Sequence, residues 1–113
     1  MKEADIILTP ILQADGQTKN RPALILRDMP RFNDFLVCGV SSQLHQKVED
    51  FDEIISAKDE DFANSGITDS LVRLAFLAVL PRAKIIGSIG SISSTRHHQL
   101  LKNLSDYLIK ENA

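Results

Sequence analysis

Short apolar runs separated by polar turns make up most of the chain. The runs typical of β-strands occupy residues 6–8, 23–26, 35–40, 54–55, 71–74, 75–80 and 85–89. Residues 23–26 are apolar throughout, which predicts a strand covered on both faces. Short strands broken by turn signals in this way are typical of a small antiparallel barrel.

Turn signals mark the boundaries between these runs. The prolines that close a run or mark a loop are Pro10, Pro30 and Pro81. The polar stretch 13–20 contains Asp15-Gly16, a pair that readily adopts positive φ, and it predicts a hairpin loop. Residues 58–64 predict a helical turn that stops at Gly66.

The C-terminal part of the chain has a different period. Its apolar residues recur with the spacing of one helix face, at Leu100, Leu101, Leu104, Tyr107 and Leu108. This pattern predicts a terminal helix with one apolar stripe. A hydroxyl from Ser93, Ser94 or Thr95 is available to cap its first turn.

Length and composition narrow the class of protein. With 113 residues and a mass of 12.6 kDa, we expect one domain, residues 1–113, that buries a core without disulfides or metals. The one cysteine, Cys38, lies in an apolar run and is interpreted as a small buried hydrophobe. No signal peptide, membrane span, zinc spacing or nucleotide fingerprint is evident. We therefore expect a cytoplasmic protein with no metal, no cofactor and no membrane partner.

The charge is unevenly distributed along the chain. A formal net charge of −2 argues against a nucleic-acid binder. However, residues 49–61 contain seven of the acidic residues and one lysine, so the remainder has a basic excess. The carboxylates of this acidic segment do not follow the EF-hand spacing, and a solvated surface is the default interpretation.

Two short segments carry residues suited to anion chemistry. Lys19 and Asn20 precede Arg21, whose neighbour Pro22 fixes the backbone at the start of a buried strand. A guanidinium held in this way suits a planar anion such as phosphate, although a solvated surface arginine is the commoner outcome. The second segment is Ser41-Ser42-Gln43, which supplies two hydroxyls and an amide just past an apolar strand.

Three histidines are candidates for proton transfer. His45 lies just after the serine segment and titrates near neutral pH when unperturbed. His97 and His98 are adjacent on the predicted helix, so they point in different directions. A two-histidine ribonuclease mechanism requires His45 to meet one of them across the fold.

Five segments in sequence resemble the motifs of the MazF/PemK family of toxin endoribonucleases. Residues 4–8 resemble its G-D-I-V strand, and residues 20–26 resemble R-P-A-L-V-L, the most specific element. Residues 37–42 resemble the strand that ends P-[IV]-T-S. Residues 70–74 resemble S-x-V-R-L, and residues 86–93 resemble K-I-G-x-L-S.

The resemblance implies a fold and an activity. The fold is mainly β, a small SH3-like antiparallel barrel of the PemK/CcdB type with short helical turns and a C-terminal helix. The activity is metal-independent cleavage of single-stranded RNA by attack of a 2′-hydroxyl, at a short preferred sequence. The implied partners are a second copy of the chain and a cognate antitoxin that blocks the RNA groove.

The resemblance also assigns roles to residues. Arg21 matches the arginine that transfers protons and steadies the phosphate, and Ser41 matches the threonine that supports the phosphorane. Because arginine is a poor general base, we expect Arg21 and Ser41 to stabilise the transition state. His45, or a network of 2′-hydroxyls, then handles protons. The RNA-binding candidates are Lys19, Asn20, Ser42, Gln43 and Arg73.

The chain departs from the family motifs at several positions. Gly39 stands in place of the usual proline, Ser41 in place of threonine, and Ala75 in place of an aspartate that some members carry. Ala4 replaces a glycine, a change that is expected to be minor. If catalysis needs the missing carboxylate, His45 is the candidate substitute base.

Two alternative functions remain open. One is a non-catalytic toxin on the same barrel, like CcdB, which binds DNA gyrase. The other is a degenerate member that binds RNA or protein without turnover. Under the ribonuclease interpretation, Arg21 and Arg73 should lie on a positive face, with the acidic segment displaced from it.

Overall fold

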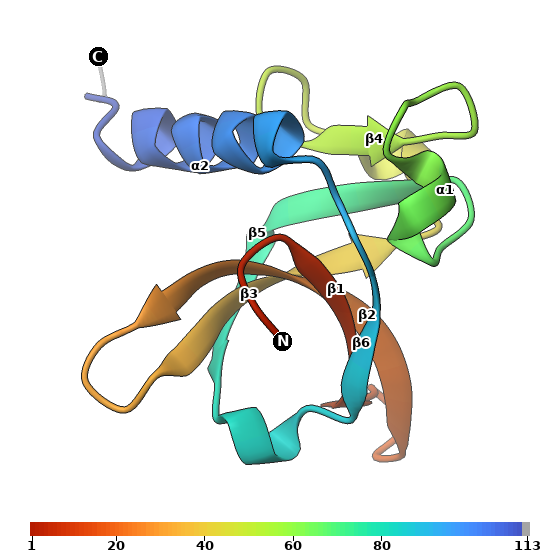
Figure 1. Cartoon of the computed structure of the whole chain (residues 1–113), viewed down its shortest axis with the longest axis vertical. Coiled ribbons are helices and arrows are strands. Elements are labelled where there is room, and N and C mark those ends of the chain that lie inside the picture. Colours follow the sequence, from red (N-terminus) through yellow and green to blue (C-terminus); the bar gives the residue numbers. More distant parts are fainter. Residues whose placement is uncertain (112–113) are drawn as a thin grey trace.

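The computed structural model describes residues 1–111, which form one curled antiparallel sheet and a C-terminal helix (Figure 1). The order of strands in the sheet is β4-β5-β3-β2-β1-β6. The strands are β1 (Asp5–Leu12), β2 (Thr18–Met29), β3 (Asp34–Ser41), β4 (Glu53–Ile55), β5 (Ser70–Leu80) and β6 (Gly87–Ser91). The helices are α1 (Phe62–Ser65) and α2 (Ser94–Leu108), with 3-10 turns η1 (Leu44–Gln46) and η2 (Arg82–Lys84). The expectation of a mainly β, PemK-type barrel is confirmed.

The first hairpin differs from the sequence prediction. β1 does not end at Pro10 but continues to Leu12, and β2 already begins at Thr18, so the loop is shorter than residues 13–20. Pro10 is tolerated within β1 because β6 pairs with β1 only as far as Leu8. Beyond that point β1 is an edge strand, where a missing N–H costs no ladder hydrogen bond.

Alternate side chains of the sheet enter two separate cores. Leu24 and Leu26 of β2 belong to a first cluster that also contains Leu100 and Leu104 of α2. The second cluster lies on the other face and consists of Ile7, Ala23, Ile25, Phe35, Val37 and Ile85. Residues 23–26 are all buried, which confirms the prediction of a strand covered on both faces.

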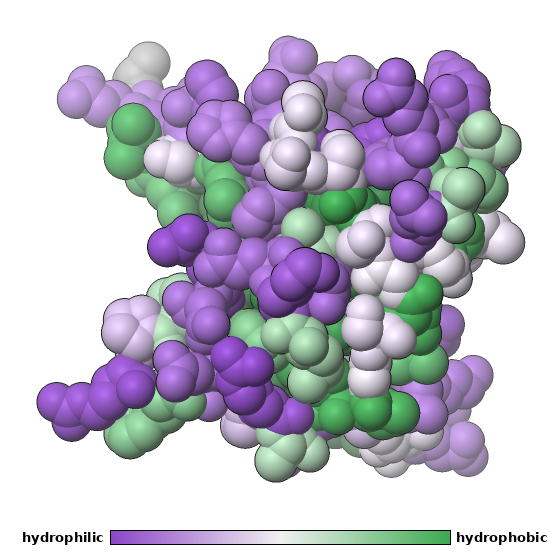
Figure 2. Space-filling model, viewed as in Figure 1, coloured by the Kyte–Doolittle hydropathy of each residue, from purple (hydrophilic) through white to green (hydrophobic). Residues whose placement is uncertain are grey.

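Helix α2 begins and ends close to where its pattern predicts. The hydroxyl of Ser93 accepts a hydrogen bond from the backbone N–H of Arg96 and caps the first turn. The predicted apolar stripe is buried at Leu100 and Leu104, but Tyr107 and Leu108 are exposed. The apolar surface at this end of the helix is visible in Figure 2. Within residues 1–111, no helix has the length and hydropathy required to cross a membrane.

The acidic segment is mostly part of the fold, which corrects the interpretation of a solvated surface. The buried carboxylate of Asp52 accepts hydrogen bonds from the N–H groups of Val48 and Leu74. Another three carboxylates surround the guanidinium of Arg96: Glu53, Asp59 and Asp61. Buried carboxylates require such partners. The exposed members of the segment are Glu49, Asp50 and Glu60.

Candidate functional site

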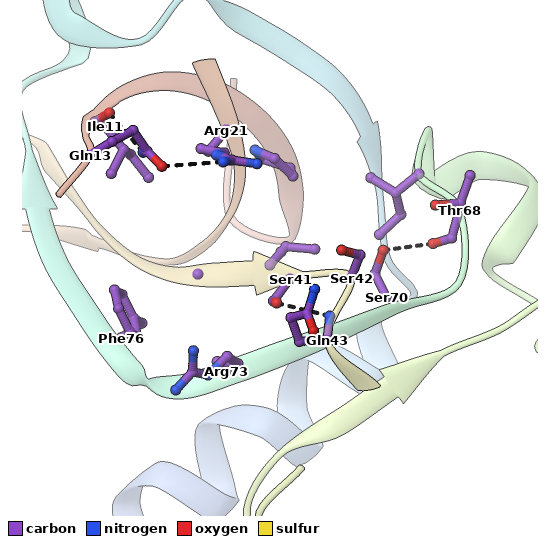
Figure 3. A pocket seen from close by; sticks show the side chains of 14 residues that line it. Ile11, Gln13, Arg21, Ser41, Ser42, Gln43, Thr68, Ser70, Arg73 and Phe76 are labelled. Carbon is purple, nitrogen blue, oxygen red and sulfur yellow. Dashed lines mark hydrogen bonds between the residues drawn. The ribbon is translucent and has the colours of Figure 1, made fainter. Parts of the chain in front are cut away.

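A cavity of about 580 Å³ lies where β2, β3 and β5 approach one another (Figure 3). Its lining comes from three parts of the chain. These are the β1–β2 hairpin (Ile11, Gln13, Arg21, Pro22), the end of β3 with its following turn (Gly39, Val40, Ser41, Ser42, Gln43), and β5 with the loop before it (Ile67, Thr68, Ser70, Arg73, Phe76).

Strand periodicity explains why these side chains converge. Residues two apart in a strand share a face of the sheet. Ala23 belongs to the second core cluster, and Arg21 continues its face toward the start of β2. Gly39 pairs with Ala23 on one side and with Arg73 on the other. Ser41 follows Gly39 on the same face. One face of the sheet therefore contributes to the second core cluster over part of its length, and the cavity lies on the same face where no core residues cover it.

The side chain of Arg21 is exposed at this end and is oriented by the hairpin. Its Nη2 donates to Oε1 of Gln13 at 3.2 Å. Gln13 is itself fixed, because its Nε2 donates to the carbonyl oxygen of Ile11 at 3.0 Å. A guanidinium has five N–H donors in a planar fork. The bond to Gln13 uses one of them and leaves donors available to an anion in the cavity.

The hydroxyl of Ser41 is held by the turn that follows β3. Its Oγ accepts a hydrogen bond from the backbone N–H of Gln43 at 3.0 Å. This bond uses one of the two lone pairs of the oxygen, and the hydroxyl proton can be donated to a ligand. On the opposite rim, the buried Ser70 donates to the carbonyl oxygen of Thr68 at 2.7 Å and leaves the Thr68 side chain exposed.

Electrostatics favour an anionic ligand. Within residues 1–111, the cavity lining contains Arg21 and Arg73 and no carboxylate. None of the acidic segment lines the cavity, as the ribonuclease interpretation requires, although Glu53 of β4 pairs with Val72, next to Arg73. Among the described residues, no cluster of His, Cys, Asp or Glu is suited to hold a metal ion.

The structure brings together some of the sequence-predicted residues and not others. Those that line the cavity are Arg21, Ser41, Ser42, Gln43 and Arg73. Lys19 and Asn20 are exposed further toward the start of β2, outside the lining. His45 lies in η1, also outside it. His97 Nε2 is 2.8 Å from the carbonyl oxygen of Leu26, a hydrogen bond on the α2 side of the molecule. Within residues 1–111, no hydrogen bond joins His45 to His97 or His98.

Sequence reasoning missed Gln13, Thr68 and Phe76. Gln13 sits in the polar hairpin loop next to the Arg21 segment, and that proximity was the available signal. Thr68 precedes a strand that the motif had already singled out. Phe76 had no signal, because it lies in an apolar run that predicts core packing. Cys38, by contrast, is fully buried as expected, and burial, with the Asp52 carboxylate as a second cause, raises the pKa of its thiol to about 12.

The fold and the site define a class of small, mainly β proteins in which a curled antiparallel sheet carries an arginine-lined cavity. Comparison with protein families gives the particular family. Residues 2–108 match the model of PemK-like, MazF-like toxins of type II toxin-antitoxin systems, and the chain belongs to this family. The family implies an antitoxin as partner. No curated protein gave a match to the chain.

Proposed function

We propose that the protein is an endoribonuclease toxin that cleaves single-stranded RNA at a short sequence without a metal ion. The observation that supports this most is the grouping of Arg21, Arg73 and Ser41 in one carboxylate-free cavity. Two guanidiniums attract the phosphate backbone, and a hydroxyl adds a donor to a phosphoryl oxygen. Family membership is the independent support.

The reaction places defined demands on these groups. The 2′-hydroxyl attacks the adjacent phosphorus in line and loses its proton, while the 5′-oxygen leaves and gains one. The products are a 2′,3′-cyclic phosphate and a 5′-hydroxyl. Arg21 neutralises the charge that develops on the non-bridging oxygens, and Ser41 donates a hydrogen bond to one of them. Preorganised donors of this kind supply most of the stabilisation in such reactions.

Proton transfer is assigned to His45 or to a network of 2′-hydroxyls. Within residues 1–111, the lining holds no histidine, cysteine, lysine, tyrosine or carboxylate, and a guanidinium is a poor proton acceptor. His45 follows Gln43 by two residues and is the nearest histidine along the chain to the cavity wall. If His45 accepts the proton, His45→Gln lowers kcat at neutral pH and flattens the fall of the rate on acidification. An unchanged pH–rate profile in this variant leaves the 2′-hydroxyl network as the route.

The test of the proposed function is a cleavage assay with a long RNA in the presence of EDTA. We expect the wild-type chain to cut the RNA and Arg21→Ala to lower the rate by about 100-fold or more, because a charge-stabilising donor is lost. Arg27→Ala is the matched control. Arg27 is an exposed arginine on the same strand, is paired with Glu3 and lies outside the cavity lining. Full activity of Arg21→Ala would exclude the assignment.

A second copy of the chain and an antitoxin are the proposed protein partners. β4 pairs with β5 only at residues 70–72, so the outer edge of β5 has no neighbouring strand beyond that point within the described residues. Leu77 and Val79 on this part of β5 are 42% and 54% exposed. Exposed apolar side chains along an open strand edge are typical of an interface. Light scattering over a concentration series tests the homodimer.

One observation also favours a non-catalytic member of the family that binds without turnover. Ala75 stands where some family members have an aspartate, and no side-chain base lines the cavity within residues 1–111. Such a protein binds RNA through Arg21 and Arg73 but leaves it intact. A CcdB-like toxin that acts on gyrase neither binds nor cuts RNA. The EDTA assay, combined with a binding measurement, separates all three functions.

A further inference from the structure

An exposed phenylalanine lies in the cavity beside an arginine. The side chain of Phe76 is 60% exposed, although phenylalanine is usually buried. The guanidinium carbon of Arg73 lies 4.8 Å from the centroid of the Phe76 ring. Both side chains come from β5, on the opposite wall from Arg21, as Figure 3 shows. The guanidinium lies over one face of the ring, in a cation–π contact. The remaining exposed surface of the ring, together with the outer side of the guanidinium, is available to a planar ligand.

A bulge in β5 positions the ring in the cavity. Arg73 pairs with Gly39, but the next pair is Leu77 with Cys38, so residues 74–76 have no partner on β3. In a regular strand, residues three apart point to opposite faces of the sheet. The extra residues change this relation, and both Arg73 and Phe76 line the cavity. Bulges commonly redirect a side chain next to a functional site.

Gly39 provides the space that the ring occupies. A Cβ atom built on Gly39 would lie 3.1 Å from the Cβ of Phe76, which is closer than ordinary van der Waals contact. A side chain at position 39 would therefore require Phe76 to shift by a few tenths of an ångström. The absence of a side chain at Gly39 thus lets Phe76 approach β3 closely at this point.

We propose that Phe76 and Arg73 form a stacking platform for one unpaired nucleobase of the RNA, next to the phosphate held by Arg21 and Ser41. This inference rests on the proposed function and adds a specificity determinant to it. Bases of single-stranded RNA stack on aromatic rings and on guanidinium planes. The polar side chains of Ser42, Gln43 and Thr68 line the same cavity and offer hydrogen bonds to base edges.

Because the chain contains no tryptophan, Phe76→Trp introduces a unique fluorescent reporter of stacking. The probe is a mixed-sequence 2′-O-methyl RNA 12-mer, which lacks the attacking hydroxyl and is not cut. We expect saturable quenching of the indole when the RNA is added. The matched control is Phe32→Trp, because Phe32 is 77% exposed in the β2–β3 turn and outside the cavity lining. Its emission should not respond to the RNA.

Binding measurements on the same 12-mer test the energetic role of the ring. Phe76→Leu should weaken binding about tenfold, because a stacking surface is lost. Phe76→Tyr should retain binding, and Phe32→Leu should not change it. The thermal melting of Phe76→Leu should match that of the wild type, because the ring is mostly exposed.

The outcomes separate the platform from the proposed function. Quenching without any RNA cleavage by the wild type supports the platform and overturns the catalytic proposal. Cleavage without quenching, together with equal affinities of Phe76→Leu and Phe32→Leu, overturns the platform and keeps the catalytic proposal. An indole emission that responds to protein concentration but not to RNA would place Phe76 between copies of the chain, and it also overturns the platform.

Discussion

Ala4 shows how one residue can carry backbone strain. Its φ is 76°, in the left-handed region that favours glycine. Two backbone hydrogen bonds fix it there: its N–H donates to the carbonyl oxygen of Ile25, and its own carbonyl accepts from the N–H of Ile92. The family motif has glycine at this position, and the exchange expected to be minor from the sequence is therefore a strained one.

We expect Ala4→Gly to raise the free energy of unfolding by about 1 kcal/mol. The left-handed conformation costs a non-glycine residue about 1–2 kcal/mol, and the extra entropy of unfolded glycine offsets part of the gain. Urea denaturation at neutral pH measures the difference. The control is Ala14→Gly, because Ala14 is exposed and has no positive φ, so that variant should not gain stability. A loss of stability in Ala4→Gly would contradict the strain argument.

At the scale of single residues, the sequence predicted the site in part. Arg21 and Ser41 could be found because each follows from a local signal, a proline-fixed arginine and a hydroxyl past a strand end. Phe76 could not be found, since its position depends on a bulge that only the pairing of β3 with β5 defines. Local sequence indicates which side chains can bind an anion, but it does not indicate the register in which two strands pair.

At the scale of elements, Arg96 ties helix α2 to the acidic segment. Its Nε and Nη2 donate to the two carboxylate oxygens of Asp61 at 2.9 and 3.2 Å. Its Nη1 donates to Glu53 at 2.9 Å and to the carbonyl oxygen of Ile54 at 3.2 Å. Asp61 also accepts from the N–H of Ser93, at the start of α2. This network fixes the helix on β4 and α1.

Removal of the Arg96 side chain should therefore destabilise the folded protein. We expect Arg96→Leu to lower the free energy of unfolding by about 3 kcal/mol, because partly buried carboxylates lose their counter-charge. The matched control is Lys102→Leu on the same helix. Lys102 pairs with Asp106 in an exposed i,i+4 bridge, which contributes only about 0.5 kcal/mol. Chemical denaturation of both variants measures the contrast, and equal losses would show that the network adds nothing specific.

The same network gives stability a dependence on pH. Burial alone raises the pKa of Asp61, but hydrogen bonds from Arg96 and Ser93 and the charge of Arg96 outweigh it and hold the pKa below the usual 3.8. A depressed folded-state pKa stabilises the fold above the unfolded pKa, and this contribution is lost as the pH falls through the folded value. We expect Asp61→Asn to unfold less steeply with acid than the wild type. Parallel acid titrations followed by circular dichroism measure the slopes.

The contacts of the acidic segment (residues 49–61) could not be predicted from the sequence. Its carboxylates gave the default interpretation of a solvated surface, whereas the structure pairs three of them with Arg96. The arginine lies 35 residues beyond Asp61, and only the return of the chain over β6 into α2 brings them together. In contrast, the strands and the helix depend on local period and caps, and the sequence located most of them to within a few residues. The exceptions are the first hairpin and residues 70–80, which form one strand where the sequence predicted two.

At the scale of the whole molecule, acidic and basic side chains lie in different places. The net charge of −2 taken alone argues against an RNA ligand. Three of the carboxylates in residues 49–61 are bound to Arg96, and the cavity lining contains arginines without carboxylates. The potential that a ligand meets depends on nearby groups, because salt screens exposed charges beyond about 8–10 Å. Local charge, rather than the total, should then decide binding.

Two variants of equal net charge test this directly. Thr68→Glu adds a carboxylate to the exposed rim of the cavity, whereas Thr95→Glu adds one to the exposed first turn of α2, outside the lining. We expect Thr68→Glu to weaken binding of the 2′-O-methyl RNA about tenfold at low salt, since like charges a few ångströms apart at a protein surface repel by more than about 1 kcal/mol. Thr95→Glu should change the affinity less than about twofold, because screening removes distant repulsion. If the two variants lose affinity equally, total charge governs binding, and the arginine-lined cavity is not where the RNA lies.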